Sequence, residues 1–466
     1  MGLRQPVRRL SVDELLERAA SVASLAMLRE YAEPSPIQIA AIDEYAVLLD
    51  SELESLPPYE SPTRDRILAQ LDIHWSIFAP IRRLPTELLC EIFSCVQDIY
   101  PLRTLQAATV ISHVCFTWRT VARGHGSLWT KVIVGTMNDF DKYCERFLPL
   151  ARQAPLELRC DNREILLELW DRIASYASRW RRITLVAGLR MLPDLQVLYM
   201  ENLERLVVDA YDAPTSTEIS ALDFVVAPRL GHLALTLDAL QSERQLHVPG
   251  VQMLTSLDIT TDSPFPITLT LPLLKACAST LRSLTLKVRY PLEGPEGSYP
   301  TSTSDVFAME ALTFLSLVDP ACALLNIITA PLVEVLILSN VPAYGAASLL
   351  HFLTRGHDAR YLTEIRVYKP ENRNIPAWLP CLQLMNNLAV LHFDDLLSNR
   401  AFLELLVRHK DTLLPSLKFV NICQIARDHK ELHVILGGLC RARARKRFIN
   451  GQVAYEELRW VQDYPI

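Results

Sequence analysis

Hydrophobic positions along this sequence follow two periods, with a change near residue 180. Ahead of that point, apolar residues recur every three or four positions, which is the spacing of one face of a helix. Beyond it, short stretches alternate apolar and polar residues, which is typical of a strand that is buried on one side. The pattern predicts a helical first part, followed by a series of short strands with helices between them.

Residues 1–79 are predicted to be a helical segment. Ser11 and Glu14 have the spacing of a capping box, which indicates that a helix begins there and runs to about Glu30. Two further helices are predicted, one on each side of the Pro57-Pro58 break. Their apolar faces are Ile42, Tyr45, Leu49, Leu53 and Leu56, and then Ile67, Leu71, Trp75 and Phe78. These faces could form a coiled-coil dimerisation arm or pack against neighbouring helices. Because the pattern lasts only about two heptads, we favour packing.

Residues 80–135 are predicted to form a second helical unit. Leu84-Pro85 suits a helix start because proline lacks the N–H that would have no partner in the first turn, and Glu87 complements the positive helix end. Apolar rows follow on this helix and on a second one. The rows are Leu88, Ile92 and Val96; Leu89 and Phe93; and then Val110, Val114, Trp118 and Val121. The unit therefore has more apolar surface than one small partner layer would cover.

The order of residues in this unit, L-P-x-E-L-L-x-x-I-F, then V-C-x-x-W, then L-W, resembles the F-box, a short helical module. The matching residues are Leu84, Pro85, Glu87, Leu88, Leu89, Ile92, Phe93, Val114, Cys115, Trp118, Leu128 and Trp129. In the F-box family, the module binds the Skp adaptor of cullin-based ubiquitin ligases. The resemblance implies that the adaptor is contacted by Leu84, Pro85, Leu88, Leu89, Ile92, Phe93, Val114, Trp118, Leu128 and Trp129.

Two departures from the family pattern concern that contact. The stretch between Phe93 and Val110 is longer than the family's usual acidic turn, and Phe116 stands where a basic residue is common. By periodicity alone, an ordinary helical hairpin that packs only its own core is the alternative interpretation.

From Trp180 onward, a hexamer with apolar residues at its first, fourth and sixth positions recurs at intervals of about 26 residues. Its ten copies are Trp180-Ile183-Leu185, Leu203-Leu206-Val208, Leu230-Leu233-Leu235, Leu254-Leu257-Ile259, Leu281-Leu284-Leu286, Leu312-Leu315-Leu317, Leu332-Val335-Ile337, Leu362-Ile365-Val367, Leu388-Leu391-Phe393 and Leu417-Val420-Ile422. Apolar residues are common enough for such hexamers to arise by chance, so their even spacing and the helical stretches between them carry more weight. Those stretches are 273–279, 324–328, 346–354 and 401–414.

This alternation resembles the leucine-rich repeats that often follow an F-box. The whole chain resembles the fungal, basidiomycete-like group of F-box proteins with degenerate repeats, in which a helical segment commonly precedes the F-box. The asparagine of the usual repeat appears only as Asn340, so we expect an irregular solenoid over 136–425 and a helical cap over 426–466. The expected fold class is α/β: an all-helical segment with the F-box, then a solenoid of short parallel strands and helices. A compact α/β domain is the alternative for the second part.

One face of the expected strands is a candidate surface for a protein substrate. If the fourth and sixth residues of each hexamer point inward, the third, fifth and seventh point outward. Several outward positions in the later repeats are apolar or carry Arg, which is typical of protein-binding surfaces. The substrate-binding candidates are Phe314, Leu336, Leu338, Arg366, Tyr368 and Phe419. A register error of one residue would invert these facings, and the breaker-rich stretch 291–304 could fold over the face.

Composition and charge exclude several other classes of protein. With 466 residues, half of them hydrophobic, the chain is long enough for two or three folded domains. The net charge of −6 gives no general attraction to nucleic acid, and no apolar run approaches the roughly 20 residues of a membrane-spanning helix. The ten cysteines are scattered without C-x-x-C pairs, so we expect reduced thiols in the cytoplasm and/or nucleus. The basic stretch 441–447 is either a solvated helix end or a nuclear-import patch.

Catalytic signatures are missing from the sequence. No phosphate-binding glycine loop, G-x-S-x-G elbow or H-E-x-x-H motif occurs, and His429 with His433 lacks further ligands for a metal. We therefore expect no catalytic residue, no metal and no cofactor. The resulting hypothesis is a non-catalytic receptor subunit of an SCF-type cullin ubiquitin ligase, whose F-box binds the Skp adaptor and whose repeats bind a protein substrate. The alternatives are a leucine-rich scaffold or regulator outside a ligase, and an unrecognised enzyme in a compact α/β domain.

Overall fold

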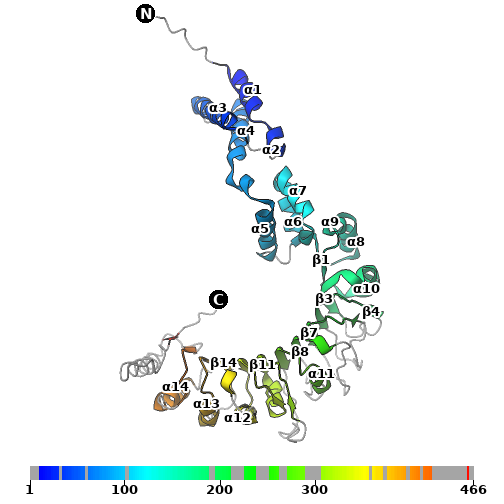
Figure 1. Cartoon of the computed structure of the whole chain (residues 1–466), viewed down its shortest axis with the longest axis vertical. Coiled ribbons are helices and arrows are strands. Elements are labelled where there is room, and N and C mark those ends of the chain that lie inside the picture. Colours follow the sequence, from blue (N-terminus) through cyan, green and yellow to red (C-terminus); the bar gives the residue numbers. More distant parts are fainter. Residues whose placement is uncertain are drawn as a thin grey trace, which may run out of the picture. The chain divides into compact units, whose positions relative to one another are not determined.

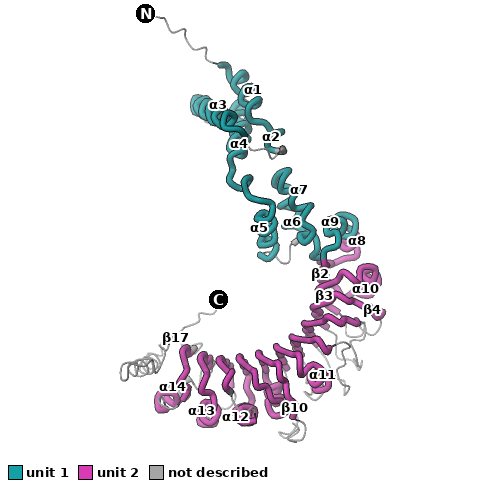
Figure 2. Tube along the Cα trace, in the orientation of Figure 1, with its two compact units in different colours: residues 1–132, 142–154 teal, residues 133–141, 155–466 magenta. Residues whose placement is uncertain are grey.

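In the computed structural model, helices form the first part of the described chain, and parallel strands with helices between them form the rest (Figure 1). The described residues are 10–30, 34–57, 61–99, 104–187, 195–210, 225–237, 251–261, 270–288, 306–355, 359–370, 375–394, 399–409, 413–421 and 459–460. The chain divides into two compact units, Met1–Val132 with Lys142–Ala154 and Ile133–Asp141 with Pro155–Ile466 (Figure 2). The domain limits expected from the sequence, at residues 79, 135 and 425, stay predictions.

Four helices precede the F-box-like motif. They are α1 (Val12–Val22), α2 (Leu25–Glu30), α3 (Pro36–Ser55) and α4 (Pro62–Phe78). The predicted capping box is present, because Ser11 Oγ accepts from the backbone N–H of Glu14 and the Glu14 carboxylate accepts from the backbone N–H of Ser11. The single helix expected up to Glu30 is instead two helices, with an extended Ala23 between them.

The N-terminal helices pack around a shared apolar core that includes part of the predicted apolar faces, whereas Trp75 of the second face is exposed. Its buried members are Leu15, Leu16, Ala19, Ala46, Leu49, Ile67 and Leu71. Removing a Leu or Ile side chain from water stabilises a fold by about 1.5–3 kcal/mol, so this core can hold α1, α3 and α4 together. Arg66 also donates from Nη1 to Asp13 Oδ1 at 2.9 Å, on the exposed side of the group.

The motif itself forms a second group of helices. They are η1 (Pro80–Arg83), α5 (Thr86–Ile99), α6 (Thr104–Val114), α7 (Phe116–Gly124) and η2 (Gly126–Trp129). The sequence prediction of one helix from Val110 to Val121 was wrong. Cys115 has an extended backbone, so α6 ends before it and α7 begins after it. The Cys115 Sγ accepts from the backbone N–H of Trp118 at 3.4 Å and so caps the start of α7.

The second unit is built on a parallel sheet. Its thirteen strands follow chain order, β1-β2-β3-β5-β7-β8-β9-β11-β13-β14-β15-β16-β17, and every described pairing is parallel. The strands are β1 (Lys131–Val134), β2 (Leu156–Cys160), β3 (Trp180–Ala187), β5 (Arg205–Ala210), β7 (His232–Leu237), β8 (Ser256–Thr261), β9 (Ser283–Val288), β11 (Phe314–Val318), β13 (Val335–Ser339), β14 (Glu364–Tyr368), β15 (Val390–Asp394), β16 (Phe419–Asn421) and β17 (Arg459–Trp460). Two short parallel pairs stand apart from it: β4 (Leu198–Tyr199) with β6 (Val225–Val226), and β10 (Phe307–Ala308) with β12 (Ile328–Thr329). The repeated apolar hexamer did not predict β1 and β2, because its first copy begins only at β3.

Described helices lie between many of the successive strands, and those of the second unit lie on one side of its sheet (Figure 2). The α-helices are α8 (Met137–Arg146), α9 (Leu148–Ala151), α10 (Leu166–Ile173), α11 (Leu271–Ala276), α12 (Gly345–Arg355), α13 (Leu379–Leu384) and α14 (Asn399–Arg408). The 3-10 helices are η3 (Arg163–Ile165), η4 (Ala174–Arg179), η6 (Val251–Met253), η9 (Asp319–Asn326), η10 (Ala359–Tyr361) and η11 (Ile375–Trp378). The helical stretches expected near 273–279, 346–354 and 401–414 correspond to α11, α12 and α14, whereas the stretch expected at 324–328 overlaps only the end of η9.

The apolar positions of the hexamers stack in rows across the sheet. One row runs through the fourth positions, for example Leu233, Leu257 and Leu284, which are register partners and buried. In nine of the ten copies, the described residues at the first, fourth and sixth positions are all buried. Period-2 alternation and parallel pairing therefore place one apolar face of each strand in a common core.

The hexamer assigned to Leu332-Val335-Ile337 is one residue out of register. Leu336 and Leu338 are fully buried, and Val335 and Ile337 lie on the opposite face. Leu336 is the register partner of Leu315 on β11 and of Ile365 on β14, so the pairing of the neighbouring strands determines its facing. The prediction that Leu336 and Leu338 point outward was wrong, and Val335 and Ile337 take their place.

Three strands are each followed by a residue whose backbone is in the left-handed region. Asp319, Asn340 and Lys369 have φ values of 61°, 48° and 48°, and each directly follows β11, β13 or β14. Positive φ is uncommon outside glycine but is better tolerated by Asn and Asp. The repeated position shows that the chain leaves these three strands by a similar turn.

Several sequence features fall outside the described residues: the stretch 291–304, the basic stretch 441–447, and His429 with His433. Within the described part, no helix is both long and apolar enough to span a membrane.

Candidate functional site

Helix α5 has apolar residues on two faces. Leu89 and Phe93 are buried, while Leu88 and Ile92 are 45% and 39% exposed. Residues three or four positions apart share a helix face, so Leu88 and Ile92 form one exposed row, which Ile99 extends a further two turns along the helix. This row begins next to the exposed Pro85 and leaves an apolar strip in water.

The buried row of α5 packs against the rest of the motif. The ring of Phe93 lies 4.9 Å from that of Trp118, centroid to centroid, at an angle of 57°. Leu128 and Trp129 are also buried, and Trp129 Nε1 donates to the carbonyl oxygen of Ala122 at 2.7 Å. Tyr143 Oη in turn donates to the Trp129 carbonyl oxygen at 2.7 Å. Leu89, Phe93, Leu128 and Trp129 therefore form the interior of the module and position its surface, and they have no free face for a partner.

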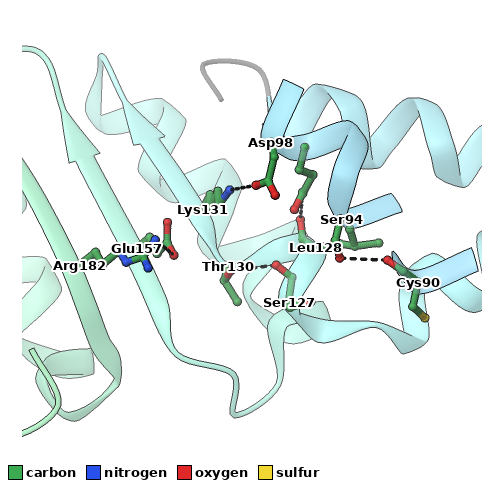
Figure 3. Close-up of polar contacts among 10 residues, drawn as sticks. Cys90, Ser94, Asp98, Ser127, Leu128, Thr130, Lys131, Glu157 and Arg182 are labelled. Atoms are coloured by element: carbon green, nitrogen blue, oxygen red, sulfur yellow. Dashed lines mark hydrogen bonds and ion pairs between the residues drawn. The ribbon is translucent and has the colours of Figure 1, made fainter. Parts of the chain in front are cut away.

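Polar contacts fix the C-terminal half of α5 to the segment that follows α7 (Figure 3). Gln97 is buried, and its Nε2 donates to the carbonyl oxygen of Leu128 at 2.7 Å. At the end of the segment, Lys131 Nζ lies 3.5 Å from Asp98 Oδ1, and Thr130 Oγ1 donates to the Ser127 carbonyl oxygen at 2.8 Å. Gln97 lies outside the residues predicted from the motif, although a polar residue in the buried row of an apolar helix is a recognisable signal.

The remaining residues of the motif are partly or largely exposed. Leu84 is half-buried, as is Trp118, and Val114 is exposed at the end of α6. Val110 on the same helix and Phe116 at the start of α7 are exposed too, and both are apolar. The ten residues predicted to contact an adaptor thus separate into an exposed or half-buried set and an interior set. The exposed or half-buried set is Leu84, Pro85, Leu88, Ile92, Val114 and Trp118.

The outward face of the sheet carries a second apolar surface. In one row across the sheet, Phe314, Val335, Glu364, Val390 and Phe419 are register partners in that order. In the next rows, the outward residues include Val318, Ile337, Arg366, His392 and Tyr368. Of the six predicted substrate-binding residues, Phe314, Arg366, Tyr368 and Phe419 lie on this face, whereas Leu336 and Leu338 do not.

Three polar side chains of this surface, on β14 and β15, lie together. Arg366 Nε forms an ion pair with the Glu364 carboxylate on the same strand. His392 Nε2 lies 3.8 Å from Glu364 Oε1, so a protonated His392 would share the same carboxylate. Glu364, Arg366 and His392 therefore form one polar cluster among the apolar residues of this surface.

The same face is polar on the earlier strands. Its outward residues on β7, β8 and β9 include His232, Asp258 and Lys287. Burial lowers the pKa of His232, the nearby charge of Arg205 lowers it further, and Asp258 opposes both effects. His232 Nε2 and Asp258 Oδ1 are buried atoms without a hydrogen-bond partner in the described structure. Nowhere in the described part do three or more His, Cys, Asp or Glu side chains gather in a group that could hold a metal ion.

Comparison with protein families identifies the motif. Residues 81–134 match the model of the F-box-like family. A comparison with curated proteins found no match to the chain. F-box proteins are typically non-catalytic subunits that bind the Skp adaptor. The chain therefore contains an F-box-like domain, which indicates an adaptor role in a ubiquitin ligase complex.

Proposed function

We propose that this chain is the substrate-recognition subunit of an SCF-type cullin ubiquitin ligase. The observation that carries the proposal is the exposed apolar row of α5, because it lies inside the segment that matches the F-box-like family. Contiguous apolar surface of this kind in a soluble module commonly marks a protein-binding site.

The proposed adaptor contact consists of Leu88 and Ile92 on α5, with Pro85 and Leu84 beside the start of the helix and Val114 at the end of α6. Full burial of a Leu or Ile side chain is worth about 1.5–3 kcal/mol, and these side chains can supply part of that only when a partner covers them. The interior residues Leu89, Phe93, Leu128 and Trp129 act indirectly, by holding the exposed row in place.

The second unit is proposed to be a degenerate leucine-rich-repeat solenoid. The hexamers support this, because in nine of the ten the described residues at the first, fourth and sixth positions are buried, and each falls on one strand of a parallel sheet in chain order. The outward face of β11 to β16 is proposed to hold the protein substrate. Its anchors would be the aromatic residues Phe314, Tyr368 and Phe419, since buried aromatic side chains commonly dominate interface energetics. Ile337 would add apolar contact area, and Arg366 a polar contact.

The proposed mechanism is proximity. The F-box-like domain joins the chain to the adaptor and, through it, to a cullin, while the outward face of the sheet holds the substrate near the conjugating enzyme. Holding two reactants together raises their effective concentration without any catalytic residue in this chain. The proposed location is the cytoplasm and/or nucleus.

The proposal can be tested by capturing tagged chain from cells and quantifying the adaptor and cullin by mass spectrometry. Leu88→Ala with Ile92→Ala should remove both partners, because it deletes the exposed row and leaves the interior of the module intact. A matched control is Leu332→Ala with Leu384→Ala, two similarly exposed leucines of the second unit. Adaptor captured in undiminished amount by the α5 variant would contradict the adaptor contact, and adaptor without cullin would favour a scaffold outside a ligase.

The same capture experiment tests the substrate surface. Phe314→Ser, Ile337→Ser and Tyr368→Ser together should leave the adaptor bound and remove proteins that accumulate when the proteasome is inhibited. Val186→Ser with Val207→Ser changes outward residues of β3 and β5 and serves as the control. An unchanged set of accumulating proteins would count against this face.

A further inference from the structure

Helix α3 of the N-terminal group, like α5, is apolar on two faces. Ile42, Ala46 and Leu49 are buried. On the other side, Ile37 and Val47 are 83% and 68% exposed, and Leu48 is 42% exposed. An amphipathic surface helix would place polar residues at these positions, so the exposed side of α3 departs from what its own packing requires.

The exposed apolar residues of α3 share one side of the helix. From Ile37, Val47 and Leu48 are ten and eleven positions on, which is close to three helical turns. Ala40 and Ser51 are small, exposed residues on the same side, so Glu44 is the one large polar residue among the six positions that make up this side. We call this side, defined by Ile37, Ala40, Glu44, Val47, Leu48 and Ser51, the outer face of α3. Over its 20 residues the helix is about 30 Å long, which is enough to accommodate a helix of similar length.

The charges of α3 all have one sign. The helix carries five carboxylates and neither Lys nor Arg: Asp43, Glu44, Asp50, Glu52 and Glu54. Glu44 lies within the outer face itself, between Ile37 and Leu48. The same face of a second copy, a nucleic acid or an anionic membrane would bring like charge against these carboxylates, which disfavours association. A positively charged apolar partner would instead be attracted to them.

We propose that the outer face of α3 is a docking surface for a basic amphipathic helix of a partner protein. The apolar side chains of the partner cover Ile37, Val47 and Leu48, and its Lys or Arg side chains lie along Asp43, Glu44 and the other carboxylates. In this binding mode, an amphipathic helix packs its apolar side on an apolar surface. The side chains of the bound helix that anchor it are three, four and seven residues apart. The surface precedes the F-box-like match at 81–134 and is separate from both surfaces proposed above.

The test uses the full chain and a fluorescent synthetic helical peptide with Leu at every third or fourth position and Lys elsewhere. Val47→Ser with Leu48→Ser should weaken binding about tenfold or more, because covering the two side chains contributes at least about 1.4 kcal/mol. Asp43→Asn with Glu44→Gln should weaken it severalfold and reduce its dependence on salt. A peptide with Glu in place of Lys should not bind.

Control variants test whether peptide binding depends on the outer face of α3 or only on the net negative charge of the chain. Met253→Ser and Glu201→Gln change exposed residues of the second unit and should leave peptide binding unchanged. Equal binding by the Val47/Leu48 variant and the unmodified chain would overturn the proposal. Sedimentation velocity should show a monomer, and a dimer that Val47→Ser with Leu48→Ser dissociates would overturn it in favour of a second copy.

The chain's own Arg4, Arg8 and Arg9, which lie outside the described residues, supply the last arm of the test. Replacing all three with Gln should leave peptide affinity unchanged. A tenfold gain would mean that this segment of the same chain occupies the outer face of α3, which would overturn the proposal of a separate partner.

Discussion

Helix α5 and strand β13 both contain adjacent apolar pairs, and in both the two members of a pair are separated by burial. In α5, Leu89 is buried and Leu88 is exposed; in β13, Leu336 is buried and Val335 is only half-buried. The separation has a different origin in the two elements. Successive residues of a helix are about 100° apart, so two neighbouring apolar rows make one wide face. Successive residues of a strand point to opposite faces, so a shift of one residue exchanges the two sets completely.

The difference shows which kind of information each element needs. In α5, the row that faces inward is determined by partners on other helices, such as Trp118 against Phe93. In β13, it is determined by the register with β11 and β14. In neither case does hydrophobicity alone distinguish the inward residue from its neighbour.

The largest effect is expected at the buried row of α5. Phe93→Ala should lower the free energy of unfolding by about 3–5 kcal/mol, because it leaves a cavity beside Trp118. Ile92→Ala, the adjacent control, should cost less than about 1 kcal/mol. The measurement is hydrogen exchange of residues 86–99 followed by mass spectrometry, with urea unfolding for the free energy. Similar losses for the two variants would remove the distinction between the rows.

A somewhat smaller effect is expected at β13. Leu336→Ala should destabilise the sheet by about 2–5 kcal/mol, and Ile337→Ala should do so far less, since only the first opens a cavity in the core row. Urea unfolding followed by the amide exchange of 314–318 and 335–339 would measure both. If Ile337→Ala proved the more damaging change, the register assigned to β13 would be the opposite one.

The smallest effect, with no change in stability, concerns the reactivity of thiols. Burial raises the pKa of Cys381 to about 12 and that of Cys277 to about 11. A raised pKa reduces the fraction of reactive thiolate below that pKa, so at pH 8 iodoacetamide should modify these residues at least about a hundredfold more slowly than the exposed Cys95 and Cys115. Mass spectrometry at successive times gives the rates. Equal rates in folded protein, with denatured protein as the control, would contradict the burial of Cys277 and Cys381.

The sequence by itself determined features that depend on near neighbours in the chain. The Ser11 and Glu14 capping box forms within one turn, and the order of residues from Leu84 to Trp129 suffices to indicate the F-box-like match. In nine hexamers the described residues have the predicted facing, because each carries one consistent period-2 set of apolar residues.

Tertiary structure decided the features for which the sequence offered two equivalent choices. Leu332 and Val333 are adjacent and both apolar, so β13 had two possible registers until pairing with β11 and β14 selected one. Leu88 and Leu89 were likewise equivalent until the packing of α5 buried one of them. Burial depends on what approaches from elsewhere in the chain, and a local pattern of hydrophobic residues does not contain that information.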